Sequence, residues 1–248
     1  MAESDLCTLL EWDTHFFGQR IARVKSATLT IEQANHVDLW CHDHRIDCLY
    51  FLADSNHAET VLIAEDYNYR QVDVRLTYEL NVAKNHQANA LPNDFDYTID
   101  SACSDDLPHL LVIASDTFSN SRFYYDKYFT YEQANELYRL WLMRSIEDNF
   151  ADKVIIFRKD NTPQGFITCI LDKVSSTGVI SLVSVAEQAR GKQLGTHLVQ
   201  QALSYFQQES MQIVQVVTQA RNVGANRLYQ NCGFRTKNVQ LWYHKWFV

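Results

Sequence analysis

The chain has few of the residues that interrupt regular structure, with only 7 glycines and 3 prolines among 248 residues. This scarcity excludes collagen-like and low-complexity classes and argues against long disordered segments. No apolar run approaches the roughly 20 residues that a helix needs to cross a bilayer. The first residues also lack the basic segment and apolar core of a signal peptide. We therefore expect a folded protein that stays in the cytoplasm and does not insert into membranes.

Positive charge is also scarce, since 22 lysines and arginines face 30 aspartates and glutamates, for a net charge of −8. This balance argues against nucleic acid as a partner, although a loop or helix N-terminus can still attract a small anion. The six cysteines include no C-x-x-C pair, so we expect reduced thiols. Cys41, His44 and Cys48 would share a helix face, but the helix is expected to end near Arg45. No metal site is predicted there.

Apolar periodicity predicts an α/β protein. The polar, aperiodic stretch 83–94 predicts a linker between an N-terminal α/β domain at 1–90 and a second domain at 95–248. Residues 67–80 resemble 232–244, so the first domain could be a partial repeat of the second. The expected strands are 8–12, 20–27, 46–53, 71–82, one within 97–115, 153–158, 164–172, 178–185, 212–218 and 238–247. The expected helices begin at the capping boxes of Thr30 and Thr130, near residue 56, late in 97–115, after the loop at 187–196 and near residue 223.

Two of the seven glycines, Gly191 and Gly195, lie in one short stretch, "EQARGKQLGTHLV" at 187–199. It follows an apolar run at 178–185 that predicts a buried strand, and it leads into an amphipathic helix. A strand–loop–helix connection presents unpaired N–H groups at the positive end of the helix dipole, where phosphate groups bind. Arg190 and Lys192 add positive charge. An ordinary flexible turn explains the same pattern, so the loop alone leaves the function open.

The loop is neither G-x-x-x-x-G-K-[ST] nor G-x-G-x-x-G, which excludes the two commonest nucleotide-binding loops. It resembles the Gln/Arg-x-x-Gly-x-Gly/Ala acyl-CoA motif of the GNAT superfamily of N-acyltransferases at Gln188 and Gly191, with Gln193 in place of the second small residue. The stretch "NVGANRLYQNCGF" is similar to the superfamily's Asn-x-x-Ala-x-x-x-Tyr-x-x-x-Gly-Phe pattern. The residues that match it are Asn222, Ala225, Tyr229, Gly233 and Phe234.

The resemblance implies the GNAT fold, a mixed and mostly antiparallel twisted sheet flanked by helices, with an additional smaller N-terminal α/β domain. It implies acyl-CoA, carrying acetyl or a longer group, as a co-substrate, and no permanently bound cofactor. Backbone N–H groups of Val183 and Val185 would bind the developing oxyanion, and the Tyr229 hydroxyl would protonate the departing thiolate as a general acid. The other residues expected to hold the coenzyme are Gln188, Arg190, Gly191, Lys192, Gln193, Leu194, Gly195, Thr196 and Asn222.

The segments "LEWDTHFFGQRIARV" (10–24) and "FSNSRFYYDKYF…LYRLWLMRS" (118–145) resemble a GNAT branch that contains dTDP-fucosamine acetyltransferase. This resemblance implies a dTDP-linked 3-amino or 4-amino dideoxy sugar as the acceptor, used for surface polysaccharides such as the O-antigen of lipopolysaccharide. Arg122 would pair with the diphosphate, and Asp126 would receive the amine or relay its proton. Packing between domains explains the same aromatic loop. The residues expected to bind the acceptor are Arg122, Phe123, Tyr124, Tyr128, Trp12 and Phe17.

Other functions fit the same residues. The acceptor could instead be a peptide N-terminus, a lysine or an aminoglycoside. A non-catalytic acyl-CoA sensor would use the same loop without turnover, although the presence of Tyr229 argues against it. The sequence leaves open the acyl group, the general base and whether the chain forms a homodimer.

Overall fold

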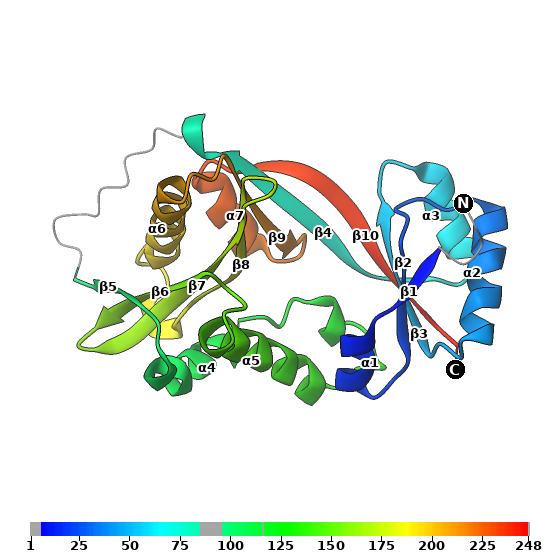
Figure 1. The fold of residues 1–248 in the computed structure, drawn as a ribbon, viewed down its shortest axis with the longest axis horizontal. Coiled ribbons are helices and arrows are strands. Elements are labelled where there is room, and N and C mark those ends of the chain that lie inside the picture. The colour runs from blue at the N-terminus through cyan, green and yellow to red at the C-terminus, as the bar shows by residue number, and fades with distance from the viewer. Residues whose placement is uncertain (1–5, 85–95, 116, 248) are drawn as a thin grey trace. The chain divides into compact units, whose positions relative to one another are not determined.

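The computed structural model describes residues 6–84, 96–115 and 117–247 (Figure 1). These residues form two compact units. Unit 1 draws on Met1–Leu76, Ser121–Gln133 and Asn238–Val248, and unit 2 draws on Thr77–Asn120 and Ala134–Lys237. Residues 85–94 of the predicted linker lie outside the described part of the chain.

This division differs from the single boundary that the sequence predicts between residues 90 and 95. Two long strands, β4 (Arg70–Asn81) and β10 (Arg235–Trp246), each begin in one unit and continue into the other. The segment 121–133 also belongs to unit 1. Composition locates a polar stretch, but it does not say which distant strands share a sheet.

Unit 1 contains the strand order β1-β2-β3-β10, with β2 and β3 parallel and the other pairs antiparallel. Helices α2 and α3 lie on one side of these strands and α1 on the other (Figure 1). An apolar cluster fills the space under α2 and α3, from Leu49 and Phe51 of β3 to Val37 and Ile63 of the helices. The elements are β1 (Cys7–Leu9), α1 (Glu11–Phe17), β2 (Ile21–Val24), α2 (Ile31–Asp43), β3 (Cys48–Asp54) and α3 (Ala58–Asp66).

The predicted strand at 8–12 is wrong beyond residue 9, because α1 begins at Glu11. Glu11 and Asp13 lie in the first turn, where acidic side chains stabilise the helix dipole. Gly18, with φ of 68°, ends the helix in the left-handed conformation that glycine adopts freely. The predicted capping box at Thr30 is confirmed: its hydroxyl accepts a hydrogen bond from the N–H of Gln33 at 3.2 Å.

Unit 2 contains the strand order β4-β9-β8-β7-β6-β5, in which β8 and β9 are parallel and β5 to β8 are antiparallel. Helices α6 and α7 lie on one side of this sheet and α4 and α5 on the other (Figure 1). The predicted mixed, mostly antiparallel sheet flanked by helices is confirmed. The elements are β5 (Thr98–Ser101), α4 (Leu107–Ser115), α5 (Tyr131–Glu147), β6 (Lys153–Lys159), β7 (Thr162–Asp172), β8 (Thr177–Val185), α6 (Leu194–Gln208), β9 (Ile213–Gln219) and α7 (Val223–Asn231), with short 3-10 turns at Val82–Lys84, Ser104–Asp106, Arg122–Tyr124 and Glu187–Ala189.

Helix α6 packs tightly on the sheet of unit 2, and Gly178 of β8 permits this contact. A Cβ atom at Gly178 would lie 2.4 Å from the ring of Phe206, which is fully buried on α6. Glycine inside a strand often marks such a close approach. The position of α6, and therefore of its N-terminus, depends on this fit.

Both halves of the chain share one order of elements: β2-α2-β3-α3-β4 in the first and β8-α6-β9-α7-β10 in the second. In each series the first two strands pair in parallel. The two series differ at the start of the first helix, where Thr30 caps α2 but α6 has no side-chain cap. Among the described residues no helix is both long and apolar enough to cross a bilayer.

Candidate functional site

Strand β8 separates from β9 before it ends. The ladder between them pairs Thr177–Ile180 with Ile213–Val216, whereas β8 continues to Val185. The N–H groups of Leu182 and Ala186 point toward β7, where they donate to Thr168 Oγ1 at 2.7 Å and to the Gln164 carbonyl at 2.8 Å. Because these groups alternate along a strand, the N–H groups of Val183 and Val185 point to the β9 side, beyond the last ladder pair.

Helix α6 begins directly after the loop and leaves its first turn open. Its N-cap residue, Gln193, makes no side-chain cap hydrogen bond, and its first turn contains no acidic residue. Residues 190–193 are exposed. The free N–H groups of Leu194, Gly195 and Thr196 therefore lie at the positive end of the helix dipole, beside Arg190 and Lys192, which is a favourable position for an anion.

Positions 191 and 195 of the loop favour glycine for different structural reasons. Gly191 has φ of +77°, and a Cβ there would meet nothing within 4 Å, so only its backbone conformation requires glycine. Gln193 is also left-handed, with φ of 59°, and a residue with a Cβ pays about 1 kcal/mol for this. Gly195 has an ordinary backbone, but a Cβ on it would contact Leu228 of α7 at 3.4 Å and Val185 of β8 at 3.9 Å. The end of β8, the first turn of α6 and helix α7 therefore meet at Gly195.

Several residues that the sequence predicts to bind the coenzyme have side chains that contact other residues of unit 2. The Gln188 side-chain amide donates to Gln164 Oε1 at 3.2 Å, and Arg190 Nε donates to the carbonyl of Val185 at 3.2 Å. Leu194 is buried, so only its backbone is available to a ligand. Asn222 caps α7, accepting the N–H of Ala225 on its side-chain oxygen at 3.1 Å. Helix capping therefore explains why an asparagine stands at this position of the motif.

Tyr229 lies on α7 immediately after Leu228, and it is only 3% exposed. Its ring packs 6.0 Å from the ring of Tyr78 and 5.9 Å from that of Phe234. Burial raises the pKa of the Tyr229 phenol above its usual value. The hydroxyl therefore stays protonated at neutral pH, and burial makes it a weaker acid than a free phenol.

A second cluster lies in unit 1, on the sheet face opposite the apolar cluster. Arg23, Tyr50 and His244 are in register across β2, β3 and β10. Trp242 and Trp246 share this face with His244, because alternate residues of a strand point the same way. The segment 121–133 packs here, since the ring of its Phe129 lies 5.9 Å from His244 and 5.4 Å from Trp246.

Asp126 is buried in this cluster. Its Oδ2 accepts hydrogen bonds from His244 Nδ1 at 2.6 Å and from Trp246 Nε1 at 2.9 Å. Burial opposes the charge, but hydrogen bonds from His244 and Trp246 hold the pKa of Asp126 below its usual value. Burial lowers the pKa of His244 to about 4, against the opposing effect of Asp126. At neutral pH the imidazole is therefore neutral, with its Nδ1–H on Asp126 and a buried Nε2 that has no partner among the described residues.

The predicted acceptor residues fall into two groups. Phe17 and Phe123 are buried and packed against each other, with ring centroids 5.2 Å apart, so they belong to the core of unit 1. Trp12 stacks on Phe16 and remains 42% exposed, and Tyr128 packs on Trp246. Tyr124 is half-buried beside Tyr131, and the Arg122 guanidinium lies 4.2 Å from the ring centroid of Trp242 and 5.0 Å from that of Tyr50.

Sequence reasoning missed His244, Trp242 and Tyr50. A local signal existed for two of them, since "WYHKW" at 242–246 places Trp242, His244 and Trp246 at alternate positions of a strand. The pairing with Tyr50 depends on a contact between strands almost two hundred residues apart, which no local pattern indicates. In the described part of the chain, no group of three or more His, Cys, Asp or Glu side chains could hold a metal ion.

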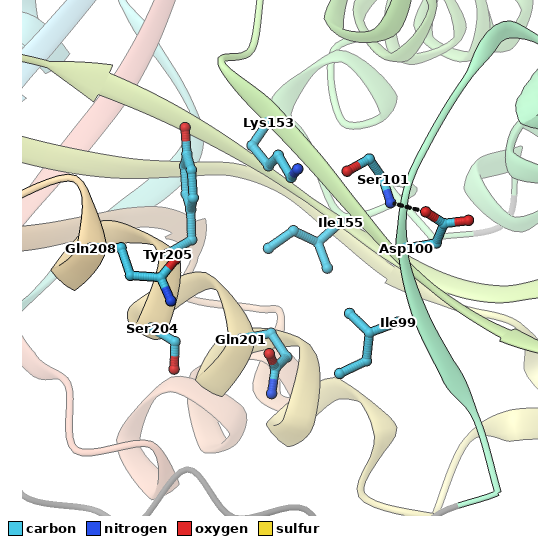
Figure 2. Close-up of a pocket in the computed structure, with 9 residues that line it drawn as sticks. All are labelled: Ile99, Asp100, Ser101, Lys153, Ile155, Gln201, Ser204, Tyr205 and Gln208. Carbon is cyan, nitrogen blue, oxygen red and sulfur yellow. Dashed lines mark hydrogen bonds between the residues drawn. The ribbon is translucent and has the colours of Figure 1, made fainter.

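An open groove of about 340 Å³ lies elsewhere in unit 2 (Figure 2). Its α6 residues, from Gln201 to Gln208, belong to the second half of that helix, away from the open N-terminus. The groove is therefore separate from the loop. It is lined by Ile99, Asp100, Ser101, Lys153, Ile155, Gln201, Ser204, Tyr205 and Gln208.

Curated relatives align with roughly half of the chain. Spore coat polysaccharide biosynthesis protein SpsD of Bacillus subtilis (strain 168) is 27% identical over 143 residues, which cover 57% of this chain and 48% of the relative. Uncharacterized N-acetyltransferase MJ1207 of Methanocaldococcus jannaschii is 28% identical over 149 residues, covering 58% of this chain and 62% of the relative. The chain thus spans less than two thirds of either relative.

Solved structures share the fold at low sequence identity. A GCN5-related N-acetyltransferase from Sphaerobacter thermophilus has a TM-score of 0.70 at 15% identity and covers 97% of this chain and 76% of its own. A tandem GNAT protein from the clavulanic acid biosynthesis pathway has a TM-score of 0.63 at 12% identity, covering 92% and 76%. Residues 118–234 match the model of the acetyltransferase (GNAT) family. The chain therefore has the GNAT fold, and the similarity to the acetyltransferase (GNAT) family model is confined to residues 118–234.

Proposed function

We propose that the chain is an acyl-CoA-dependent N-acyltransferase whose coenzyme site is the loop at 187–196. The observation that carries the proposal is the meeting of three features at Gly195: the parted end of β8, the uncapped first turn of α6, and α7 with Tyr229. Free N–H groups of the first turn would bind the diphosphate, with Arg190 and Lys192 adding charge. Gln193 and Thr196 would border the diphosphate, while Gln188 would stay bonded to the Gln164 side chain and Asn222 would cap α7.

The chemistry follows from these positions. A neutral amine attacks the thioester carbonyl, forming a C–N bond, and the carbonyl oxygen gains negative charge. The N–H groups of Val183 and Val185, which point away from β7, would stabilise this oxyanion. The C–S bond then breaks, the thiolate takes the Tyr229 proton, and the amine nitrogen loses its extra proton to a base or to water.

We further propose that the acceptor is the amine of a dTDP-linked amino-dideoxy sugar. SpsD, a partial relative, is named for spore coat polysaccharide biosynthesis, which would fit a sugar acceptor. In unit 1, Arg122 supplies a charge for a diphosphate, and exposed Trp12 and Tyr128 supply faces for a base or a deoxy sugar. Asp126 would act through His244 rather than by contact, because its carboxylate is held by His244 and Trp246.

The N-terminal half would be a partial repeat that has lost the coenzyme site. Its series of elements matches that of the second half, but the Thr30 side chain already accepts the N–H of Gln33 in the first turn of α2, and acidic Glu32 lies in the same turn, where it would repel a diphosphate. We therefore expect one coenzyme for each chain, at α6.

The test is transfer from acetyl-CoA to dTDP-3-amino and dTDP-4-amino sugars, comparing the wild type with Tyr229→Phe. General acid catalysis contributes about 10²- to 10⁴-fold, so kcat should fall within that range while the affinity for CoA stays unchanged. Tyr205→Phe is the matched control, because it removes a hydroxyl from the separate groove of unit 2.

Two results would reject the proposal. Wild-type kcat in Tyr229→Phe would exclude the role of the phenol, and tight binding of CoA without transfer to any amine would make the chain a sensor. Transfer to peptides alone would leave the proposed acyl transfer in place and replace the sugar acceptor by a peptide.

A further inference from the structure

Three partly buried arginines of unit 1 differ from Arg158 and Arg139, which each have an acidic partner. Arg158 forms an ion pair with Asp106 at 2.6 Å, and Arg139 forms one with Glu136 at 2.7 Å. Among the described residues, no carboxylate forms an ion pair with Arg23, Arg75 or Arg122. These three side chains are only partly exposed, so water compensates their charge incompletely.

The three guanidinium groups lie close enough to influence one another. Those of Arg23 and Arg122 both lie over the ring of Trp242, at 5.5 and 4.2 Å from its centroid. Burial lowers the pKa of Arg75, and the charges of Arg23 and Arg122 lower it further. Burial and the charge of Arg122 likewise lower the pKa of Arg23. The main electrostatic neighbours of Arg23 and Arg75 are therefore other arginines.

Their hydrogen-bonding capacity is also incompletely used. Nε of Arg75 and Nε of Arg122 are buried and have no hydrogen-bond partner in the described part of the chain. Two acids lie nearby. Asp13 of α1 interacts electrostatically with Arg122 without forming an ion pair with it, and burial raises the pKa of Asp13 above its usual value. The carboxylate of Asp126 is held by His244 and Trp246, so these two acids do not balance three arginines. Such a cluster destabilises the ligand-free protein, since like charges repel and buried donors lack acceptors.

We propose that Arg23, Arg75 and Arg122 together bind a diphosphate, with Trp242 and Tyr50 holding the guanidinium of Arg122 by stacking. Planar guanidinium groups match phosphate oxygens through paired hydrogen bonds, and stacking on aromatic rings fixes their orientation. A diphosphate supplies two negative charges, which would offset the repulsion among the arginines. It also supplies several acceptor oxygens for the buried N–H groups that lack a hydrogen-bond partner. Arg23 and Arg75 thereby become specificity residues in addition to Arg122.

The identity of the ligand as the diphosphate of a nucleotide-linked acceptor rests on the proposed function, but its anionic chemistry does not. The experiment is calorimetric titration of the full chain with dTDP, with thymidine and with CoA. We expect dTDP to bind and thymidine to bind at least tenfold more weakly. The affinity for dTDP should fall about tenfold or more in Arg75→Gln and in Arg23→Gln, because each loses a charge-assisted hydrogen bond. Arg70→Gln is the matched control, since Arg70 is exposed on the same strand as Arg75.

Thermal unfolding of the ligand-free protein separates a binding role from a structural one. Removing one of three mutually repelling charges should leave Tm unchanged or raise it in Arg75→Gln, whereas a structural arginine would lower it. Unchanged dTDP affinity in both variants, or a lower Tm in both, would overturn the inference. Loss of CoA affinity instead of dTDP affinity would also overturn it.

The two proposals can fail separately. If dTDP binds through these arginines but no dTDP-amino sugar is acylated, the arginine site stands and the proposed acceptor falls. If dTDP-amino sugars are acylated with an unchanged KM in Arg75→Gln and Arg23→Gln, the proposed function stands and the arginine site falls.

Discussion

The buried pair of Asp126 and His244 gives unit 1 a pH dependence that one substitution should remove. In His244→Asn the amide nitrogen takes the position of Nδ1, so it can still donate to Asp126, but it does not titrate. Burial lowers the pKa of His244 to about 4 in the folded protein, against about 6.5 in an unfolded chain. As the pH falls, the unfolded state therefore binds this proton first, and unfolding becomes more favourable between pH 6.5 and pH 4.

The gap between the two pKa values corresponds to roughly 3 kcal/mol, at about 1.4 kcal/mol for each pKa unit. Above pH 7 the contribution of His244 is constant, and the variant should be less stable than the wild type, because it loses the imidazole that stacks on Tyr50 at 4.5 Å. Between pH 7 and pH 4.5 the wild type should lose stability that the variant keeps. The difference between the two proteins should therefore shrink by about 2 to 3 kcal/mol.

The assay is urea unfolding at several pH values, followed by tryptophan fluorescence. Trp12, Trp40, Trp242 and Trp246 lie in unit 1, whereas Trp141 lies in unit 2, so the signal reports mainly on unit 1. His42→Asn removes an exposed imidazole from the same unit and is the control. A difference between His244→Asn and the wild type that stays constant from pH 7 to pH 4.5 would refute the reasoning.

Two further predictions concern unit 2. Gly178→Ala should destabilise the protein by about 1–3 kcal/mol, because the new methyl group would lie 2.4 Å from the Phe206 ring; in chemical denaturation, Phe206→Leu should reduce this loss, and additive losses would contradict the packing explanation. Gln193→Val should lower stability by about 1–2 kcal/mol, because a β-branched residue tolerates a left-handed backbone poorly, whereas Gln193→Gly should stay within about 1 kcal/mol of the wild type. A Gln193→Val protein as stable as the wild type in thermal unfolding would contradict the backbone argument.

Much of the coenzyme region could be predicted because its signals are local. The buried strand before the loop, the amphipathic helix after it and the capping box at Thr30 each depend on a few consecutive residues. Short-range periodicity and hydrogen bonding encode such features. The helix at Glu11–Phe17 was missed because a helix of only 7 residues also fits a short strand followed by a turn.

Tertiary structure decided three features of the candidate sites. These are the separation of β8 from β9, the contact of Gly195 with α7, and the sheet face shared by Arg23, Tyr50 and His244. Each depends on which strands pair and in which register, and those pairs join residues far apart in the chain. A local pattern states which side chains alternate along one strand, but it does not say which other strand lies beside it. The sequence alone therefore determined most of the elements and the loop motif, whereas the pairing of distant strands placed Arg23, Arg75 and Arg122 near one another.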